Sequence, residues 1–178
     1  MIMLVFLNEH DEKMRVMGKS LPDFLKGDYV KIYTRYNDPS QEKCETSQTF
    51  EKIKEYAAVF DKVIVSFGLR LFPPTAYKEI IEKHYKAAKS TVFLKKLKGS
   101  KTWSIGADGK LSFDNCRLSD TGLFILTAKD ILASKTDNFN LFLQELVDQK
   151  KLSYEFLSCW VMTNKKKELI KERGHGRN

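Results

Sequence analysis

The sequence predicts one α/β domain of three layers, in which helices cover both faces of a mixed, mainly parallel sheet. Strand-like and helix-like segments alternate along the 178 residues, with no repeat or linker between them, and such alternation is typical of βαβ units. Residues 62–68 (KVIVSFG) form a continuous apolar run, as expected for a strand buried on both faces. The length suits a single domain, residues 1–178, with a substantial core.

Apolar runs and alternating polarity predict the strands. They fall at residues 1–7, 29–36, 62–68, 90–98, 122–127 and 153–162. Residues 101–113 read as a β-hairpin with Asp108-Gly109 at its turn. We expect this hairpin to be the feature that makes the sheet mixed.

Apolar residues three or four positions apart predict the helices. They fall at residues 20–27, 45–60, 73–88, 138–151 and 165–174, with one more that begins at Thr127. Asp130 follows Thr127 at the spacing of a capping box. Ile80 and His84 belong to the apolar stripe of the helix that Pro73-Pro74 opens.

Charge and cysteine content restrict the classes of partner. The net charge is +8, and the tail 164–178 contributes six basic and two acidic residues. Without interleaved aromatic residues or a known motif, this tail favours a solvated helix end over nucleic-acid binding. Three widely spaced cysteines fit a reduced, cytoplasmic protein. No apolar run approaches the roughly 18–20 residues of a membrane span.

Four segments resemble, in order, those of a known family. They are VIVSFGLRLFPP (63–74), GADGKLSF (106–113), SDTGLFILTAKDIL (119–132) and FLSCWVMTNKKKEL (156–169). The family's counterparts are a strand ending in Gly-Asp, a hairpin, an Asn-Thr-Gly-Ile-Tyr-Ile segment and a closing Trp-x-Asp segment. The family is that of nucleotidyltransferases with a glycosyltransferase-A-like, nucleotide-diphospho-sugar transferase-like fold. It includes sugar-1-phosphate nucleotidylyltransferases and their choline-phosphate relatives.

The resemblance implies a nucleotide or nucleotide-sugar site at the carboxyl ends of the strands. Residues with an implied binding position are Lys19, Gly68, Leu69, Arg70, Thr121, Gly122 and Trp160. Trp160 would stack on a base or sugar, although a Trp at a late strand end is more often a core residue. Arg70 would reach a phosphate, or would pair with a surface acid instead.

The chain differs from the family at the residues on which the family's catalytic activity depends. Family activity rests on a glycine-rich loop that cradles the triphosphate and on two acids that hold Mg²⁺. If residues 1–7 are the first strand, the loop is 8–19, which is glycine-poor and partly acidic. An alternative alignment places 15–38 on the second strand, helix and third strand, without any loop. The two acids correspond to Leu69 and Met162, which offer no oxygen to a hard cation.

Three hypotheses about function follow. The first is a degenerate nucleotidyltransferase-like protein that retains nucleotide or nucleotide-sugar binding, descended from enzymes that transfer a nucleotidyl group from an NTP to a sugar phosphate. The second is an active nucleotidyl- or glycosyltransferase whose Mg²⁺ ligands come from Asp108, Asp120 or the acids at 8–12. The third is a non-enzymatic binding or scaffold protein that uses the basic tail. The catalytic residues, nucleobase, acceptor and oligomeric state stay open.

Overall fold

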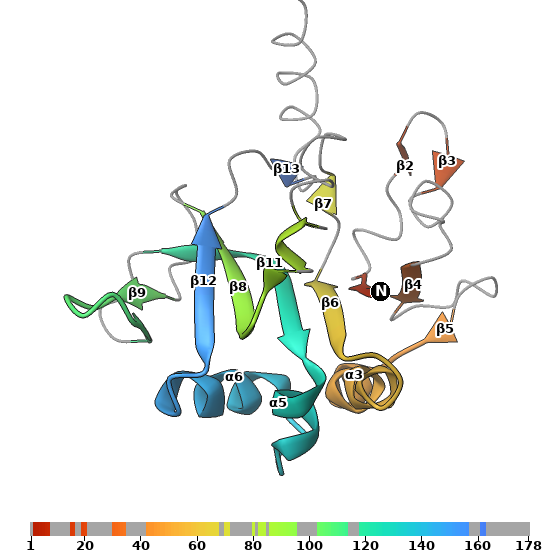
Figure 1. Ribbon diagram of the computed structural model, residues 1–178. Helices are drawn as coiled ribbons and strands as arrows, with labels where there is room; N and C mark the ends of the chain where they lie inside the picture. Colours follow the sequence, from red (N-terminus) through yellow and green to blue (C-terminus); the bar gives the residue numbers. More distant parts are fainter. Residues whose placement is uncertain are drawn as a thin grey trace, which may run out of the picture.

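The fold is described from a computed structural model of the chain (Figure 1). The described residues are 2–7, 15–16, 19–20, 30–34, 42–67, 70–71, 80, 82–84, 86–95, 103–113, 118–156 and 161–162. Gly68, Leu69, Trp160 and the basic tail 164–178 lie outside these ranges, as does all of the predicted helix 20–27 except its first residue.

A seven-stranded sheet of order β12-β8-β11-β6-β1-β4-β5 forms the centre of the molecule. Its strands are β1 (Met3–Phe6), β4 (Val30–Thr34), β5 (Glu42–Lys43), β6 (Lys62–Phe67), β8 (Ser90–Lys95), β11 (Ser119–Thr127) and β12 (Leu152–Phe156). β11 runs antiparallel to both of its neighbours, and every other pairing in the sheet is parallel. The predicted mixed, mainly parallel sheet is therefore confirmed.

The hairpin exists, but it does not make the sheet mixed, so that prediction was wrong. β9 (Ser104–Ile105) pairs with β10 (Leu111–Ser112) in a separate two-stranded sheet. The predicted turn is confirmed, since Gly109 has φ +74°, a conformation that glycine adopts without steric cost. The strand that makes the sheet mixed is β11, which runs opposite to its neighbours. Its direction depends on how the chain returns to the sheet after β8.

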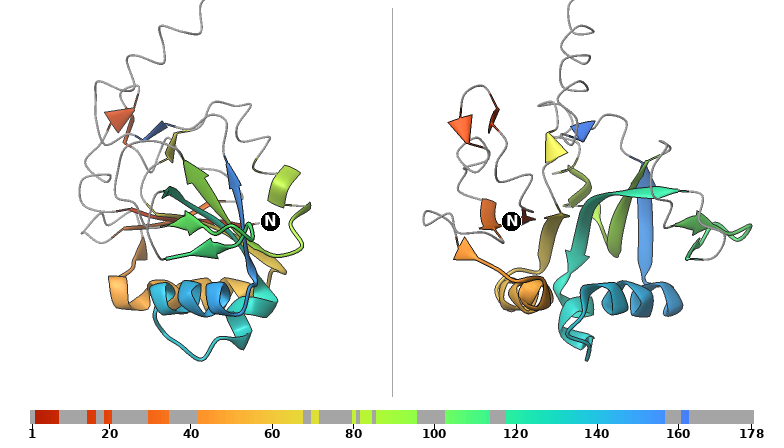
Figure 2. Two further views of the ribbon diagram at one scale, coloured as in Figure 1. Left: turned by 90° about the vertical axis from the view of Figure 1, so that its left-hand side faces the viewer. Right: turned by 180° about the vertical axis from the view of Figure 1, so that it is seen from behind.

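The predicted late strand 153–162 is in fact two strands. β12 ends at Phe156, and β13 (Val161–Met162) pairs antiparallel with β7 (Arg70–Leu71) outside the main sheet. The strand that is available as a partner, rather than the apolar composition of the segment, decides which sheet β12 and β13 each join. In the views of Figures 1 and 2 the β7–β13 pair stands at the end of the molecule opposite the helices α3 and α6.

The N-terminal segment supplies one strand of the main sheet and a separate pair of short strands. β1 lies inside the main sheet, between β6 and β4. Among the described residues, β2 (Arg15–Val16) and β3 (Lys19–Ser20) pair with each other in a separate two-stranded sheet. The predicted first strand 1–7 is therefore confirmed as a strand of the main sheet.

Helices cover both faces of the sheet, which confirms the three layers. α3 (Thr49–Ala57), preceded by the 3-10 turn η1 (Thr46–Gln48), lies on one face with α5 (Ala128–Ala133) and α6 (Phe139–Asp148) (Figures 1 and 2). Their buried side chains join those of β1, β6, β8 and β11 in one core cluster. On the opposite face, residues 80, 82–84 and 86 are helical, and Ile80 packs with Ile64, Phe93 and Leu123. Among the described helices, none is long and apolar enough to cross a membrane.

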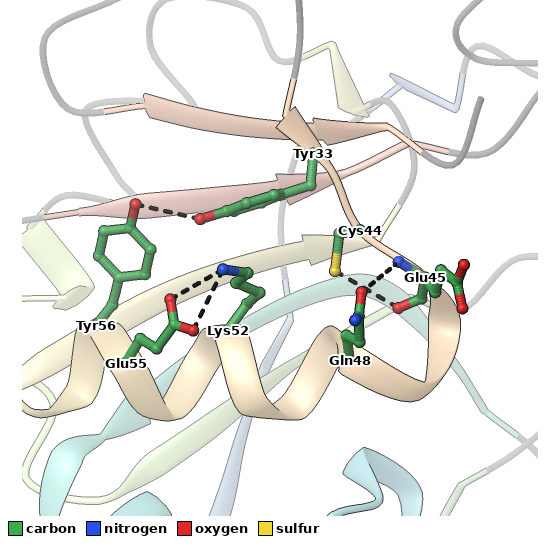
Figure 3. A network of polar contacts seen from close by, with 7 residues as sticks. All are labelled: Tyr33, Cys44, Glu45, Gln48, Lys52, Glu55 and Tyr56. Carbon is green, nitrogen blue, oxygen red and sulfur yellow. Dashed lines mark hydrogen bonds and ion pairs between the residues drawn. The ribbon is translucent and has the colours of Figure 1, made fainter. Parts of the chain in front are cut away.

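Polar contacts fix the ends of the helices. Thr127 caps α5, because its Oγ1 accepts from the Asp130 N–H at 3.4 Å and donates to Asp130 Oδ2 at 2.7 Å, which confirms the predicted cap. Figure 3 shows polar contacts around α3, whose N-cap residue Gln48 makes no side-chain capping hydrogen bond. There the Tyr33 hydroxyl donates to that of Tyr56 at 3.2 Å, so that α3 is tied to β4. Cys44 is buried beside the start of this helix.

Candidate functional site

A cleft of about 870 Å³ opens where the α3–α6 side of the sheet meets the segment 103–113. Aromatic rings supply much of its wall, namely Phe67, Trp103, Phe113, Phe124 and Phe139. Polar side chains complete it, namely Ser47, Thr49, Asp120, Asp137, Asn138, Asn140 and Gln144. Ligand sites commonly combine an apolar wall with a few polar groups in this way.

A bulge in β11 shapes one wall of the cleft. The pairing of β11 with β8 shifts register between Asp120 and Phe124, and Gly122 has φ +74°. This left-handed backbone requires glycine, so the bulge explains why the Thr-Gly dipeptide stands here. Gly122 lines the cleft, whereas Thr121 is fully buried and its Oγ1 accepts from the Leu123 N–H at 3.2 Å.

Asp120 is held at the bulge by two neutral donors. The indole Nε1 of Trp103 donates to Asp120 Oδ2 at 2.9 Å, and the Gly122 N–H donates to Oδ1 at 2.7 Å. Trp103 is only 1% exposed and lies against Phe113, with a centroid distance of 4.5 Å. The carboxylate is therefore a fixed part of the cleft wall.

The N-terminus of α6 forms the opposite rim. Asn138 caps the helix, because its Oδ1 accepts from the N–H groups of Asn140 at 2.8 Å and Leu141 at 3.3 Å. Phe139 packs edge-on against Phe124 of β11, with centroids 5.4 Å apart. This ring contact seats the helix terminus against the sheet, so that Asp137 and Asn138 stand at the cleft.

The strand-end region that the family resemblance singled out lies at β7 and β13. The two strands pair so that Met162 stands opposite Arg70. Arg70 directly follows Leu69 in the chain. The two segments that would carry the family's metal-binding acids are therefore neighbours in the β7–β13 pair. Arg70 and Met162 are 92 positions apart in the sequence.

The structure describes less of the remaining predicted site residues. Lys19 lies in β3 opposite Val16, and of its side chain nothing is described. Gly68, Leu69 and Trp160 lie outside the described residues. Among the predicted residues that the structure describes, Gly122 lines the cleft.

The carboxylates proposed as relocated metal ligands do not gather in the described part of the chain. Asp108 lies at the exposed hairpin turn, 2.8 Å from Lys110 Nζ. Hydrogen bonds from Lys110 lower the pKa of Asp108 below its ordinary value. Asp120 lines the cleft. Within the described residues no three His, Cys, Asp or Glu side chains come together as a metal site.

Sequence reasoning missed most of the cleft. Trp103, Phe113 and Phe139 line it, yet in the sequence each is an apolar residue of a hairpin or of a helical stripe. The Asp137-Asn138 pair carried a signal for a helix N-terminus. No local pattern indicated that this terminus would stand beside β11.

Comparison with known proteins identifies the fold. No family model and no curated protein matches the chain. A protein assigned as a glucose-1-phosphate thymidylyltransferase from Bacillus anthracis is similar over 99% of this chain and 95% of its own, with a TM-score of 0.59 and 11% identity. HddC from Yersinia pseudotuberculosis matches with a TM-score of 0.60 and 14% identity, over 96% of this chain and 97% of its own.

A third solved structure agrees with these two. The inositol-1-phosphate CTP transferase from T. maritima matches with a TM-score of 0.57 and 16% identity, over 93% of this chain and 90% of its own. The first and the third are named as a thymidylyltransferase and a CTP transferase, as are members of the family that the sequence resembles. The resemblance found in the sequence is confirmed for the fold, and the low identities make this chain a divergent example of it.

Proposed function

We propose that the chain is a divergent nucleotidyltransferase-like protein that binds a nucleotide or nucleotide-sugar and lacks ordinary Mg²⁺-dependent transfer. The observation that carries this proposal is the register of β7 and β13, in which Met162 faces Arg70. It supports the alignment that puts Leu69 and Met162 at neighbouring metal positions. Neither side chain offers an oxygen to a hard cation.

The residues at this site do not fit a bound Mg²⁺. Leu69 and Met162 take the positions of the family's acids, and no other cluster of metal ligands exists among the described residues. In phosphoryl-group chemistry the metal neutralises the charge that builds up on the phosphates in the transition state. Loss of this metal raises the activation free energy by several kcal/mol, which lowers the rate by a factor of order 10³.

Nucleotide binding is supported by the fold and by one basic residue, Arg70 of β7. The names of two neighbours include thymidylyl and CTP transfer, so their fold is one that handles nucleotides. Arg70 lies in β7, and its guanidinium is the kind of group that holds phosphate oxygens. An ionic interaction between a guanidinium and a phosphate needs no metal, and it weakens as the salt concentration rises.

Two assays on the same protein test the proposal. Pyrophosphate release is measured across the four NTPs with several sugar phosphates, with and without Mg²⁺, and nucleotide binding is measured by calorimetry at low and high salt. We expect no turnover above background together with weak, salt-sensitive binding. Robust Mg²⁺-dependent turnover would contradict the degenerate-enzyme proposal, and the absence of any nucleotide binding would contradict the binding part.

A further inference from the structure

The cleft has a charge opposite in sign to that of the chain. The chain carries a net charge of +8. Among the described residues that line the cleft are two carboxylates, Asp120 and Asp137, and no Lys, Arg or His. A ligand that enters the cleft therefore meets negative charge in a protein that is basic elsewhere.

Among the described residues, no cation lies against Asp120. The two donors that the structure describes for its carboxylate, the Trp103 indole and the Gly122 N–H, are neutral. In the part of the chain that the structure describes, no ion pair involves Asp120 or Asp137. The α6 N-terminus next to Asp137 supplies roughly half an elementary positive charge, which offsets part of one carboxylate and leaves the cleft negative.

Aromatic rings stand beside these carboxylates. Trp103, Phe113 and Phe139 line the same cleft. Phe113 and Phe139 are only partly buried, so part of each ring is open to the cleft. The negative face of an aromatic ring attracts an ammonium group, by about 0.5–2 kcal/mol according to desolvation. The rings and the carboxylates thus favour the same kind of ligand.

We infer that the cleft binds a small organic cation, an ammonium group attached to an apolar or aromatic body. A phosphate would lie near two carboxylates, with no basic side chain among the described lining residues, and would be repelled. The inference goes beyond the proposed function, because an organic cation without a phosphate is a different class of ligand from a nucleotide or nucleotide-sugar.

Three probes with the same ring and different charge test the inference. They are benzylammonium, benzyl alcohol and benzoate, titrated at pH 7 and low salt. Binding is followed by the fluorescence of Trp103 in a Trp160→Phe background, in which Trp103 is the remaining tryptophan of the two in the chain. We expect benzylammonium to bind about tenfold more tightly than benzyl alcohol and benzoate to bind most weakly. The preference should shrink with added salt.

A variant without the two carboxylate charges tests whether they cause the preference for benzylammonium. Asp120→Asn with Asp137→Asn keeps the shape of both side chains and should bring benzylammonium down to the affinity of benzyl alcohol. Asp61→Asn is the matched control, because Asp61 is exposed and outside the lining of the cleft, and this variant should retain the tenfold preference. Circular dichroism confirms that each variant is folded.

Several outcomes would overturn the inference. They are equal affinity for all three probes, tightest binding of benzoate, an unchanged preference in the double variant, or no fluorescence response to any probe at tens of millimolar. The result is independent of the nucleotide assays. A protein that binds benzylammonium but no nucleotide would refute the proposed function alone, and the reverse result would refute the cleft inference alone.

Discussion

The indole Nε1 of Trp103 donates a hydrogen bond of 2.9 Å to Oδ2 of Asp120. The contact joins the segment before the hairpin to the bulge of β11, and both residues line the cleft. Because Trp103 is 1% exposed, its indole donor is shielded from water, so that leaving this hydrogen bond unmade is costly.

Replacing Trp103 by Phe should destabilise the protein by about 1–3 kcal/mol, since Asp120 Oδ2 loses its donor while an aromatic ring remains. Urea unfolding of Trp103→Phe, Asp120→Asn and the double variant measures the coupling between the two residues. Interacting neighbours give a coupling energy above about 0.5 kcal/mol. Additive effects within that limit would show that the contact contributes nothing to stability.

Gly122→Ala should destabilise the protein by more than about 1 kcal/mol, because φ +74° strains any residue with a Cβ. Gly109 has the same φ at an exposed turn, where an added Cβ would have nothing within 4 Å. Gly109→Ala therefore measures the backbone strain alone. Thermal unfolding of both variants compares the sites, and a Gly122→Ala variant as stable as the parent would contradict the bulge geometry.

The protein should lose stability between pH 7 and pH 5 through His84. Burial, with a smaller effect of the Lys62 ammonium, lowers the pKa of His84 from 6.5 to about 4. The unfolded chain therefore binds a proton at pH 5 to 6 that the folded chain does not, so stability falls as pH falls below 6.5, by about 2 kcal/mol at pH 5.

Urea midpoints across pH 5 to 7 measure this slope. A His84→Gln variant should lose it, whatever its absolute stability, because the titrating group is gone. An unchanged slope in His84→Gln would assign the pH dependence to other groups.

Restoring both carboxylates should create a divalent-metal site. If Leu69 and Met162 stand at the former metal positions, the combination of Leu69→Asp and Met162→Asp supplies two oxygen ligands on neighbouring segments. Calorimetric titration with Mn²⁺ should show binding by the double variant that neither single variant has. Equal metal affinity in the single and double variants would show that the two positions do not face one site.

Local patterns in the sequence were sufficient for most elements of the fold. The apolar run 62–68 became β6 and the helical stripe of 138–151 became α6, with Phe142 and Leu146 buried. The Thr127 cap and the Asp108-Gly109 turn also appear where the sequence predicted them. Each of these features depends on residues within a few positions of one another, so that a single chain segment carries the whole signal.

The pairing of the elements was decided only by the tertiary structure. The sequence could not tell that β11 is the reversed strand, that β13 leaves the main sheet to pair with β7, or that Trp103 meets Asp120 at the wall of a cleft. The physical reason is that strand polarity, register and side-chain contacts depend on the packing of distant segments against each other. The sequence by itself determined which side chains are available, including the absence of carboxylates at Leu69 and Met162, and the fold determined which of them meet.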